Sequence, residues 1–205
     1  MIELDVRRTG DGIYIVYHDP MLNGEMISQS SYAEIQKSSI EKGFRIPELH
    51  EVLELGNQEL FLDIELKETG YETDVVEFIL EYLKPQRFMI SSFNDESIVK
   101  IKNNFPDVTT GLILGMDKPE KLIRIRLSEV FFHRRYRRTG ADVLIPHYRL
   151  FNIWNFLFYF SLKNPVFIWT VNDVKRLMKY SKKKNITGII TNYPDLLADI
   201  LRRNE

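Results

Sequence analysis

Two carboxylates stand two positions apart at the start of the chain. Glu3 and Asp5 lie on a short apolar run, and because side chains alternate along a β-strand we expect both to point to the same side. A second apolar run carries a third carboxylate, Glu65, together with Lys67. Carboxylates that share a site can hold one divalent cation, and a cation beside a lysine favours phosphate-ester chemistry.

A histidine and a tryptophan add to this set. His18 alone is more often structural, but its place after an apolar strand, facing the expected cation, favours proton transfer to a leaving alkoxide, which is typically worth about 10²–10⁴-fold. Asp19 is expected to orient the same loop. Trp169 has two interpretations of equal weight: a core residue, or a residue that lines a pocket at the end of a strand.

Each acidic and basic residue also has a simpler interpretation. Glu3 and Asp5 can form the polar face of a strand, and Lys67 can merely neutralise the carboxylates around it. Carboxylates inside a barrel nevertheless need a cation or a basic partner, because an unpaired buried charge is costly. Oxygen ligands in a chain with no cysteine favour Ca²⁺ or Mg²⁺ over Zn²⁺.

Composition narrows the class of protein. A chain of 205 residues that is 44% hydrophobic can bury a substantial core, so residues 1–205 are predicted to form a single domain. A formal net charge of −1 gives no polyanion-binding signature and disfavours nucleic acid as a partner. No signal peptide and no apolar run of roughly 18 residues is visible, which predicts a cytoplasmic location.

The elements that must position these side chains alternate between strands and helices, as in parallel α/β folds. A turn-forming cluster at 9–12 predicts a hairpin that ends in a short strand, Ile13–His18. Seven further strands are predicted: Ile2–Arg7, Leu60–Leu66, Phe88–Ser92, Thr110–Leu114, Val143–Pro146, Val166–Val171 and Gly188–Thr191. Five helices are predicted: Pro47–Leu55, Glu72–Leu83, Asp95–Asn104, Asp173–Lys184 and Pro194–Arg203. Seven strand-helix repeats approach the (β/α)₈ barrel, which has eight and about 250 residues.

Several of these pieces resemble the glycerophosphodiester phosphodiesterase family, and they occur in that family's order along the chain. The sequence IELDV is similar to its second barrel strand, the segment that ends in His18-Asp19 to its hairpin, and IPELHEVL to a helix start. The remaining matches are the strand DIELK and three later segments: Ser91–Phe93, Ile168–Asn172 and Gly188–Asn192.

The resemblance implies a (β/α)₈ barrel that uses one divalent cation to hydrolyse glycerophosphodiesters to glycerol 3-phosphate and an alcohol. It assigns metal ligation to three residues: Glu3, Asp5 and Glu65. It further implies acid–base catalysis by His18, phosphate contact by Lys67, and a pocket lined by Trp169.

One part of the family pattern is absent. The family begins with a strand that carries His-Arg-Gly, followed by a loop and a helix, and this chain starts at the second strand. We therefore expect a strand-helix unit to precede Met1 in the intact protein, and seven of eight barrel strands here. Because the missing histidine is half of a catalytic pair, we expect the present chain to turn over poorly. One alternative is a catalytically inactive relative that binds phosphodiesters or metal.

A basic segment and an aromatic segment suggest another alternative. Residues 118–138 hold eight Lys and Arg against two Glu, and residues 150–162 are rich in aromatic side chains. The simpler interpretation is a solvated basic helix. The sharper one is a face over 118–160 that contacts an anionic membrane and supports a lysophospholipase D-type activity. His147, after a predicted strand, is a further candidate at the rim of the site.

Overall fold

The structure, a computed structural model, describes residues 1–56, 59–115, 132–152 and 164–202. They form two compact units, Met1–Thr110 and Gly111–Glu205. Strand β7 (Thr109–Leu114) begins in the first unit and continues into the second. The prediction that residues 1–205 form a single domain remains a prediction, since the division into two compact units does not test it.

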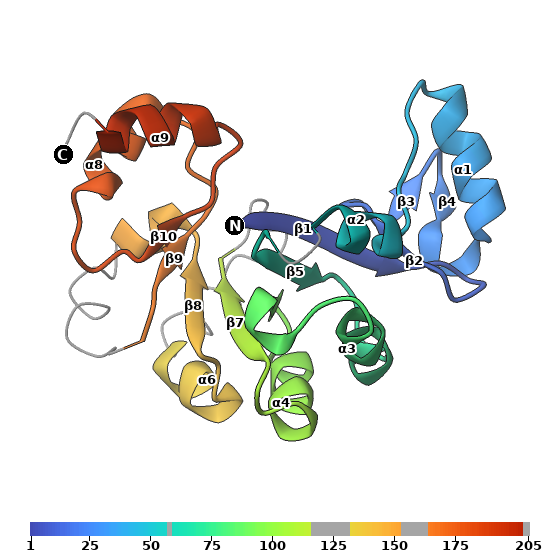
Figure 1. Cartoon of the computed structure of the whole chain (residues 1–205), viewed down its shortest axis with the longest axis horizontal. Coiled ribbons are helices and arrows are strands. Elements are labelled where there is room, and N and C mark those ends of the chain that lie inside the picture. The colour runs from blue at the N-terminus through green and yellow to red at the C-terminus, as the bar shows by residue number, and fades with distance from the viewer. Residues whose placement is uncertain (57–58, 116–131, 153–163, 203–205) are drawn as a thin grey trace. The chain divides into compact units, whose positions relative to one another are not determined.

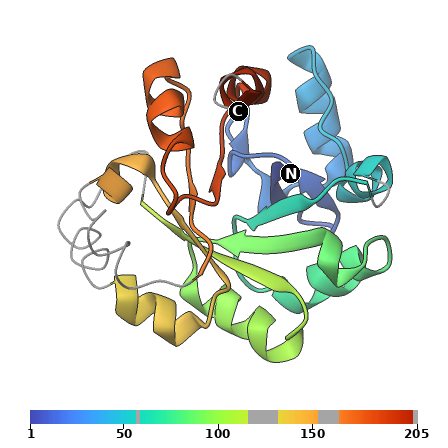
Figure 2. The same cartoon turned by 60° about the vertical axis from the view of Figure 1, so that its left-hand side comes forward.

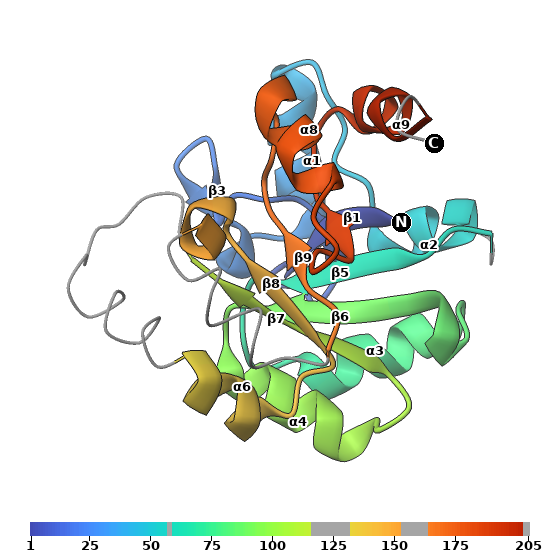
Figure 3. The ribbon, with the colours of Figure 1, turned by 90° about the vertical axis from the view of Figure 1, so that its left-hand side faces the viewer.

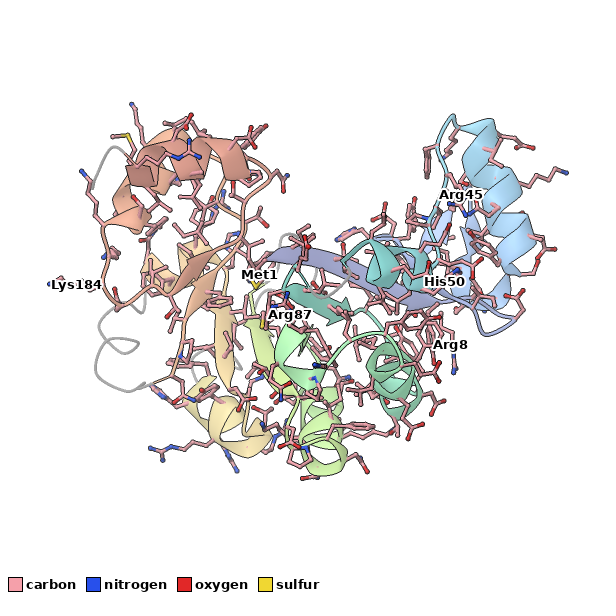
Figure 4. All side chains as sticks on the ribbon, viewed as in Figure 1. Met1, Arg8, Arg45, His50, Arg87 and Lys184 are labelled. Atoms are coloured by element: carbon pink, nitrogen blue, oxygen red, sulfur yellow. The ribbon has the colours of Figure 1, made fainter. Side chains whose placement is uncertain are left out.

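The first unit is built on strand β1 (Ile2–Arg8), whose two ends are labelled by Met1 and Arg8 in Figure 4. β1 pairs antiparallel with β2 (Tyr14–Val16), which confirms the predicted hairpin, and parallel with β5 (Leu62–Leu66). β5 in turn pairs parallel with β6 (Phe88–Ser92). Figure 1 shows β1 and β5 side by side. Parallel pairing between strands separated by helices is that of the α/β class.

Alternation along these strands separates a core face from a polar face. Leu4 and Val6 of β1 and Ile64 of β5 pack in one apolar cluster with three helices of this unit. Those helices are α2 (Leu49–Gly56), α3 (Glu72–Leu80) and α4 (Asp95–Asn104), with a short 3₁₀ turn at Pro85–Arg87. The residues between the apolar ones are carboxylates, so the opposite face of β1 and β5 is acidic.

One part of the first unit was not predicted. Four elements lie between the hairpin and α2: β3 (Met21–Leu22), β4 (Glu25–Met26), a 3₁₀ turn (Ile27–Gln29) and α1 (Tyr32–Glu41). α1 starts at a capping box, in which the Ser31 hydroxyl accepts from the Glu34 backbone N–H and the Glu34 carboxylate accepts from Ser31. This Ser-x-x-Glu pattern is visible in the sequence and would have predicted the helix.

The second unit contains the remaining strands and helices. β7 pairs parallel with β8 (Val143–Pro146), and β9 (Phe167–Ile168) pairs parallel with β10 (Gly188–Ile189). Parallel bridges from Leu144 to Val166 and from His147 to Trp169 connect β8 with β9, which lie side by side in Figure 3. The helices are α6 (Phe132–Thr139), α8 (Val174–Ser181) and α9 (Pro194–Arg202). α8 and α9 pack together, in orange and red in Figure 2.

All seven predicted parallel strands and all five predicted helices are present. The differences lie at the ends: β9 and β10 are shorter than predicted, and α2 begins at Leu49, two residues after the proline at which it was expected to start. Helices α3 and α8 each end three residues before the predicted end. Within the described ranges, none of the helices has the length and apolar content needed to span a bilayer.

Candidate active site

The register between β1 and β5 gathers the acidic residues. Glu3 lies opposite Asp63, and Asp5 lies opposite Glu65. One carboxylate oxygen from each of Glu3, Asp5 and Glu65 lies within 4.8 Å of the others. The three residues predicted to hold a cation are therefore brought together, two from one strand and one from its parallel neighbour.

The acidic cluster is defined as Glu3, Asp5, Asp63 and Glu65. Full ionisation of these four carboxylates is unfavourable, because they are close together and largely shielded from water. Burial, and after it the neighbouring carboxylates, raise the pKa of Glu3 to about 8. Burial also raises the pKa of Asp63 to about 7 and the pKa of Glu65 above its usual value. Carboxylates crowded in a partly dry site hold their protons until a cation compensates them.

Asp63 is a member of this cluster that the sequence reasoning missed. It is 1% exposed, and its Oδ1 accepts a hydrogen bond from the Ser91 hydroxyl at 2.6 Å. Its other oxygen, Oδ2, is buried without a hydrogen-bond partner in the described part of the chain. The signal was its position two residues before Glu65, on the same face of the strand. An acidic cluster with an unpartnered buried oxygen fits a hard divalent cation.

Lys67 lies beside the acidic cluster. Its Nζ is 2.8 Å from Asp5 Oδ1 and 2.6 Å from Glu65 Oε1. Burial alone would lower the pKa of Lys67, but these carboxylates outweigh it and raise the pKa above its usual value. The geometry matches the simpler interpretation of Lys67 as a counter-charge, and it also leaves the ammonium group beside any ligand that reaches the cluster.

His18 follows β2 and exposes 69% of its side chain. Its Nδ1 lies 2.8 Å from Asp19 Oδ1, so Asp19 contacts the ring, whereas the prediction was that Asp19 orients the loop. Arg7, which sequence reasoning did not single out, holds the backbone at this point: its Nε and Nη2 donate to the His18 carbonyl at 3.0 and 2.7 Å. Arg7 also pairs with Glu68, the residue after Lys67. The signal was its place in the alternating series that begins with Glu3 and Asp5.

A cavity of about 740 Å³ opens at this end of β1 and β5. Arg7 lines it from β1, and Lys67, Glu68 and Tyr71 line it from the segment after β5. Met26, on the β3–β4 hairpin, also lines the cavity. The unpredicted hairpin therefore helps to enclose the space beside Lys67.

Trp169 lies in the second unit, directly after β9. Its indole N–H donates to two backbone carbonyls, Ile145 at 3.0 Å and Leu114 at 3.3 Å, and its ring meets that of His147 edge-on at 5.1 Å. These bonds fix the indole at the ends of β7 and β8. A pocket-lining role for Trp169 stays a prediction, as does a role for His147.

About half of the predicted membrane-contact face over 118–160, residues 118–131 and 153–160, lies outside the described residues. The described part includes helix α6, in which Arg134, Arg137 and Arg138 are exposed.

Known proteins resemble this chain both in sequence and in structure. The model of the glycerophosphoryl diester phosphodiesterase family matches residues 1–196. The chain is 34% identical to a glycerophosphodiester phosphodiesterase of Caldanaerobacter subterraneus subsp. tengcongensis, over 98% of this chain and 86% of that protein. It is 28% identical to a glycerophosphodiester phosphodiesterase of Bacillus subtilis, over 97% of this chain and 75% of that protein.

Solved structures agree on the fold. An Oleispira antarctica phosphodiesterase in complex with the product sn-glycerol-3-phosphate matches with a TM-score of 0.77 and 21% identity, over 98% of this chain and 84% of that chain. A Parabacteroides distasonis glycerophosphodiester phosphodiesterase matches with a TM-score of 0.76 and 22% identity, over 98% and 83%. These matches confirm the predicted fold class, the (β/α)-barrel type.

Proposed function

The chain belongs to the glycerophosphoryl diester phosphodiesterase family, a family of phosphoric diester hydrolases, and we therefore propose that it hydrolyses glycerophosphodiesters to glycerol 3-phosphate and an alcohol. The observation that carries the proposal is the meeting of Glu3, Asp5 and Glu65 within 4.8 Å on two adjacent strands. The product complex of the Oleispira antarctica relative supports the same substrate class.

The donor set supports one divalent cation, Ca²⁺ or Mg²⁺, held by Glu3, Asp5 and Glu65, since both ions prefer carboxylate oxygens. When bound, such a cation polarises the phosphate and orients the oxygen that attacks it. Asp63 adds negative charge to the site from the neighbouring strand position, where Ser91 fixes its orientation.

Lys67 and His18 supply the remaining chemistry in this proposal. Lys67 binds a phosphate oxygen and stabilises the negative charge that grows there in the transition state. His18 exchanges a proton through Nε2, because Asp19 engages Nδ1. Arg7 is a positioning residue: its fork to the His18 carbonyl fixes where that ring can reach.

The test is release of glycerol 3-phosphate from glycerophosphocholine by the purified chain, with Ca²⁺ or Mg²⁺ and with EDTA. We expect metal-dependent turnover in the unmodified chain and none in Glu65→Gln, which removes one ligand charge. Glu54→Gln, the same change on an exposed turn of α2, is the matched control and should retain turnover.

Turnover that persists in EDTA, or that survives Glu65→Gln, would contradict the proposed metal site. A folded chain that binds the cation through the acidic cluster but releases no product would instead support the alternative of a catalytically inactive relative that binds phosphodiesters or metal. Cation binding is measured by calorimetry on the same preparation, so the two cases are separable.

A further inference from the structure

The two units of the chain have opposite charge. Met1–Thr110 contains 21 Asp and Glu against 10 Lys and Arg, a net charge of −11. Gly111–Glu205 contains 8 Asp and Glu against 18 Lys and Arg, a net charge of +10. The overall charge of −1 conceals this difference. A unit this basic raises the local concentration of anions at its surface.

Within the second unit, two arginines converge on one tyrosine. Tyr148, two residues after β8, is 8% exposed. Its hydroxyl oxygen accepts hydrogen bonds from Arg149 Nε at 3.1 Å and from Arg176 Nη1, on α8, at 2.7 Å. The Arg176 guanidinium also lies 4.7 Å from the centre of the Tyr148 ring. Both arginines are otherwise exposed.

The polar groups that these three side chains bring together are mostly hydrogen-bond donors. The Tyr148 oxygen already accepts two N–H groups, so its own hydrogen must be donated outward. Guanidinium groups have no acceptor that could receive it. The described residues therefore present one O–H and two guanidinium groups in one place, with no acceptor for the O–H and several N–H groups left over.

The positive charge at this point has no carboxylate counter-charge within the described ranges of the chain. Neither Arg149 nor Arg176 forms an ion pair with a carboxylate among the residues that the structure describes. Asp173, the acid nearest to Arg176 in the sequence, accepts the backbone N–H of Arg176 at 3.0 Å as the cap of α8. Two like charges that share one oxygen repel each other, and an anion between them removes that repulsion.

We propose that Tyr148, Arg149 and Arg176 form a binding site for a phosphate group, carried by a free phosphate compound or by a lipid headgroup. A phosphate presents several acceptor oxygens in a tetrahedral arrangement, and arginine binds such oxygens through paired N–H groups. The site lies after the C-terminal ends of β8 and β9, the end of the strands at which barrels of this class bind ligands. Its three residues belong to the second unit, whereas the acidic cluster and Lys67 belong to the first.

The test is calorimetric titration of inorganic phosphate into the whole chain at low ionic strength in EDTA. Arg176→Gln is expected to weaken phosphate binding by about tenfold or more, the typical loss for a charged hydrogen bond. Tyr148→Phe keeps the ring and removes only the O–H, and should weaken binding several-fold. Arg134→Gln, the same loss of charge on exposed helix α6, is the matched control and should change affinity by less than about twofold.

Lys67→Gln separates this site from the hydrolytic one, because Arg176-dependent binding of phosphate should persist in that variant. Equal losses in Arg134→Gln and Arg176→Gln would reduce the effect to general charge and overturn the proposal. Unchanged affinity in folded Arg176→Gln and Tyr148→Phe would overturn it as well.

Vesicles of phosphatidylglycerol distinguish the two sources of phosphate. Sedimentation with these vesicles that Arg176→Gln abolishes and Arg134→Gln retains would assign the site to a lipid headgroup. Arg176-dependent binding of inorganic phosphate, without Arg176-dependent sedimentation, would assign it to a soluble phosphate compound.

Discussion

The first and second units each gather side chains of one charge, but they resolve the resulting repulsion differently. In the first unit, Lys67 lies between Asp5 and Glu65, and the raised pKa of Glu3 shows how unfavourable the fully ionised state is. In the second unit, Arg149 and Arg176 share a hydroxyl oxygen and cannot give up their protons. A buried acidic cluster can be relieved by protonation or by an internal lysine, whereas an exposed arginine pair is relieved by solvent or by an anion from outside.

The largest expected effect is a loss of turnover on substitution of His18, a change that does not alter the charges of the acidic cluster. His18→Gln should lower turnover by about 10²–10⁴-fold, because it removes the proposed proton-transfer group, while leaving affinity for the cation unchanged. Product release and cation titration measure the two quantities. If affinity for the cation fell with turnover, His18 would belong to the metal site and not to proton transfer.

Removing the internal lysine would make the acidic cluster as uncompensated as the arginine pair. Lys67→Gln should lower turnover by about 10²–10³-fold, because a group that stabilises transition-state charge is lost. The same variant should bind Ca²⁺ or Mg²⁺ more tightly, since Lys67 no longer competes for Asp5 and Glu65. Weaker cation binding in a folded Lys67→Gln chain would show that Lys67 supports the ligands instead.

Substitution of Arg7 tests whether an arginine in the first unit positions the His18 ring. Arg7→Lys keeps the charge but loses the fork to the His18 carbonyl, so turnover should fall by roughly tenfold to a hundredfold through misplacement of the ring. The loss should appear in kcat more than in KM. An equal loss of thermal stability and activity, with kcat per folded molecule unchanged, would leave Arg7 a purely structural residue.

The acidic cluster should also make stability depend on pH. Because the folded pKa of Glu3, about 8, lies above the unfolded value of about 4.3, the folded chain binds more protons between these values. The free energy of unfolding of the metal-free chain should therefore fall as pH rises from about 4.5 to about 8. Asp63, with a pKa of about 7, adds to the same slope.

Denaturation in EDTA across this pH range measures the slope, and Glu3→Gln should reduce it. Glu25→Gln, on exposed strand β4, is the matched control and should leave the slope as it is. A slope of the opposite sign would mean that Lys67 and the protein dipoles already compensate the ionised cluster.

The smallest expected effect belongs to the second unit. Arg176→Gln should change the free energy of unfolding by no more than about 0.5 kcal/mol in phosphate-free buffer, because the side chain is exposed. Thermal unfolding at low and high salt checks this. A large destabilisation would show that the arginine pair supports the fold of the second unit and would remove the contrast with the acidic cluster.

The local pattern of residues predicted a large part of this protein. The apolar alternation of β1 and β5 places Glu3, Asp5 and Glu65 on polar faces, because side-chain direction in a strand depends only on parity. The same parity places Asp63 and Arg7 on those faces, so both could have been predicted from the same rule. The Ser31 capping box likewise marks the start of α1 in the sequence.

Other features have no local signal. The hydroxyl of Tyr148 meets Arg176 across 28 positions of sequence, and no spacing rule joins them. Asp5 faces Glu65 because β1 pairs with β5 in one register, and that register is set by how the apolar cluster packs on the other face.

Residue type and short-range geometry were enough to predict which groups could do chemistry, which strand faces they occupy and which family the chain resembles. Which charges meet depends on the tertiary structure. It paired the carboxylates with Lys67 and brought the two arginines to one shared hydroxyl oxygen, because contacts between distant segments are set by the packing of the whole core and not by any one segment.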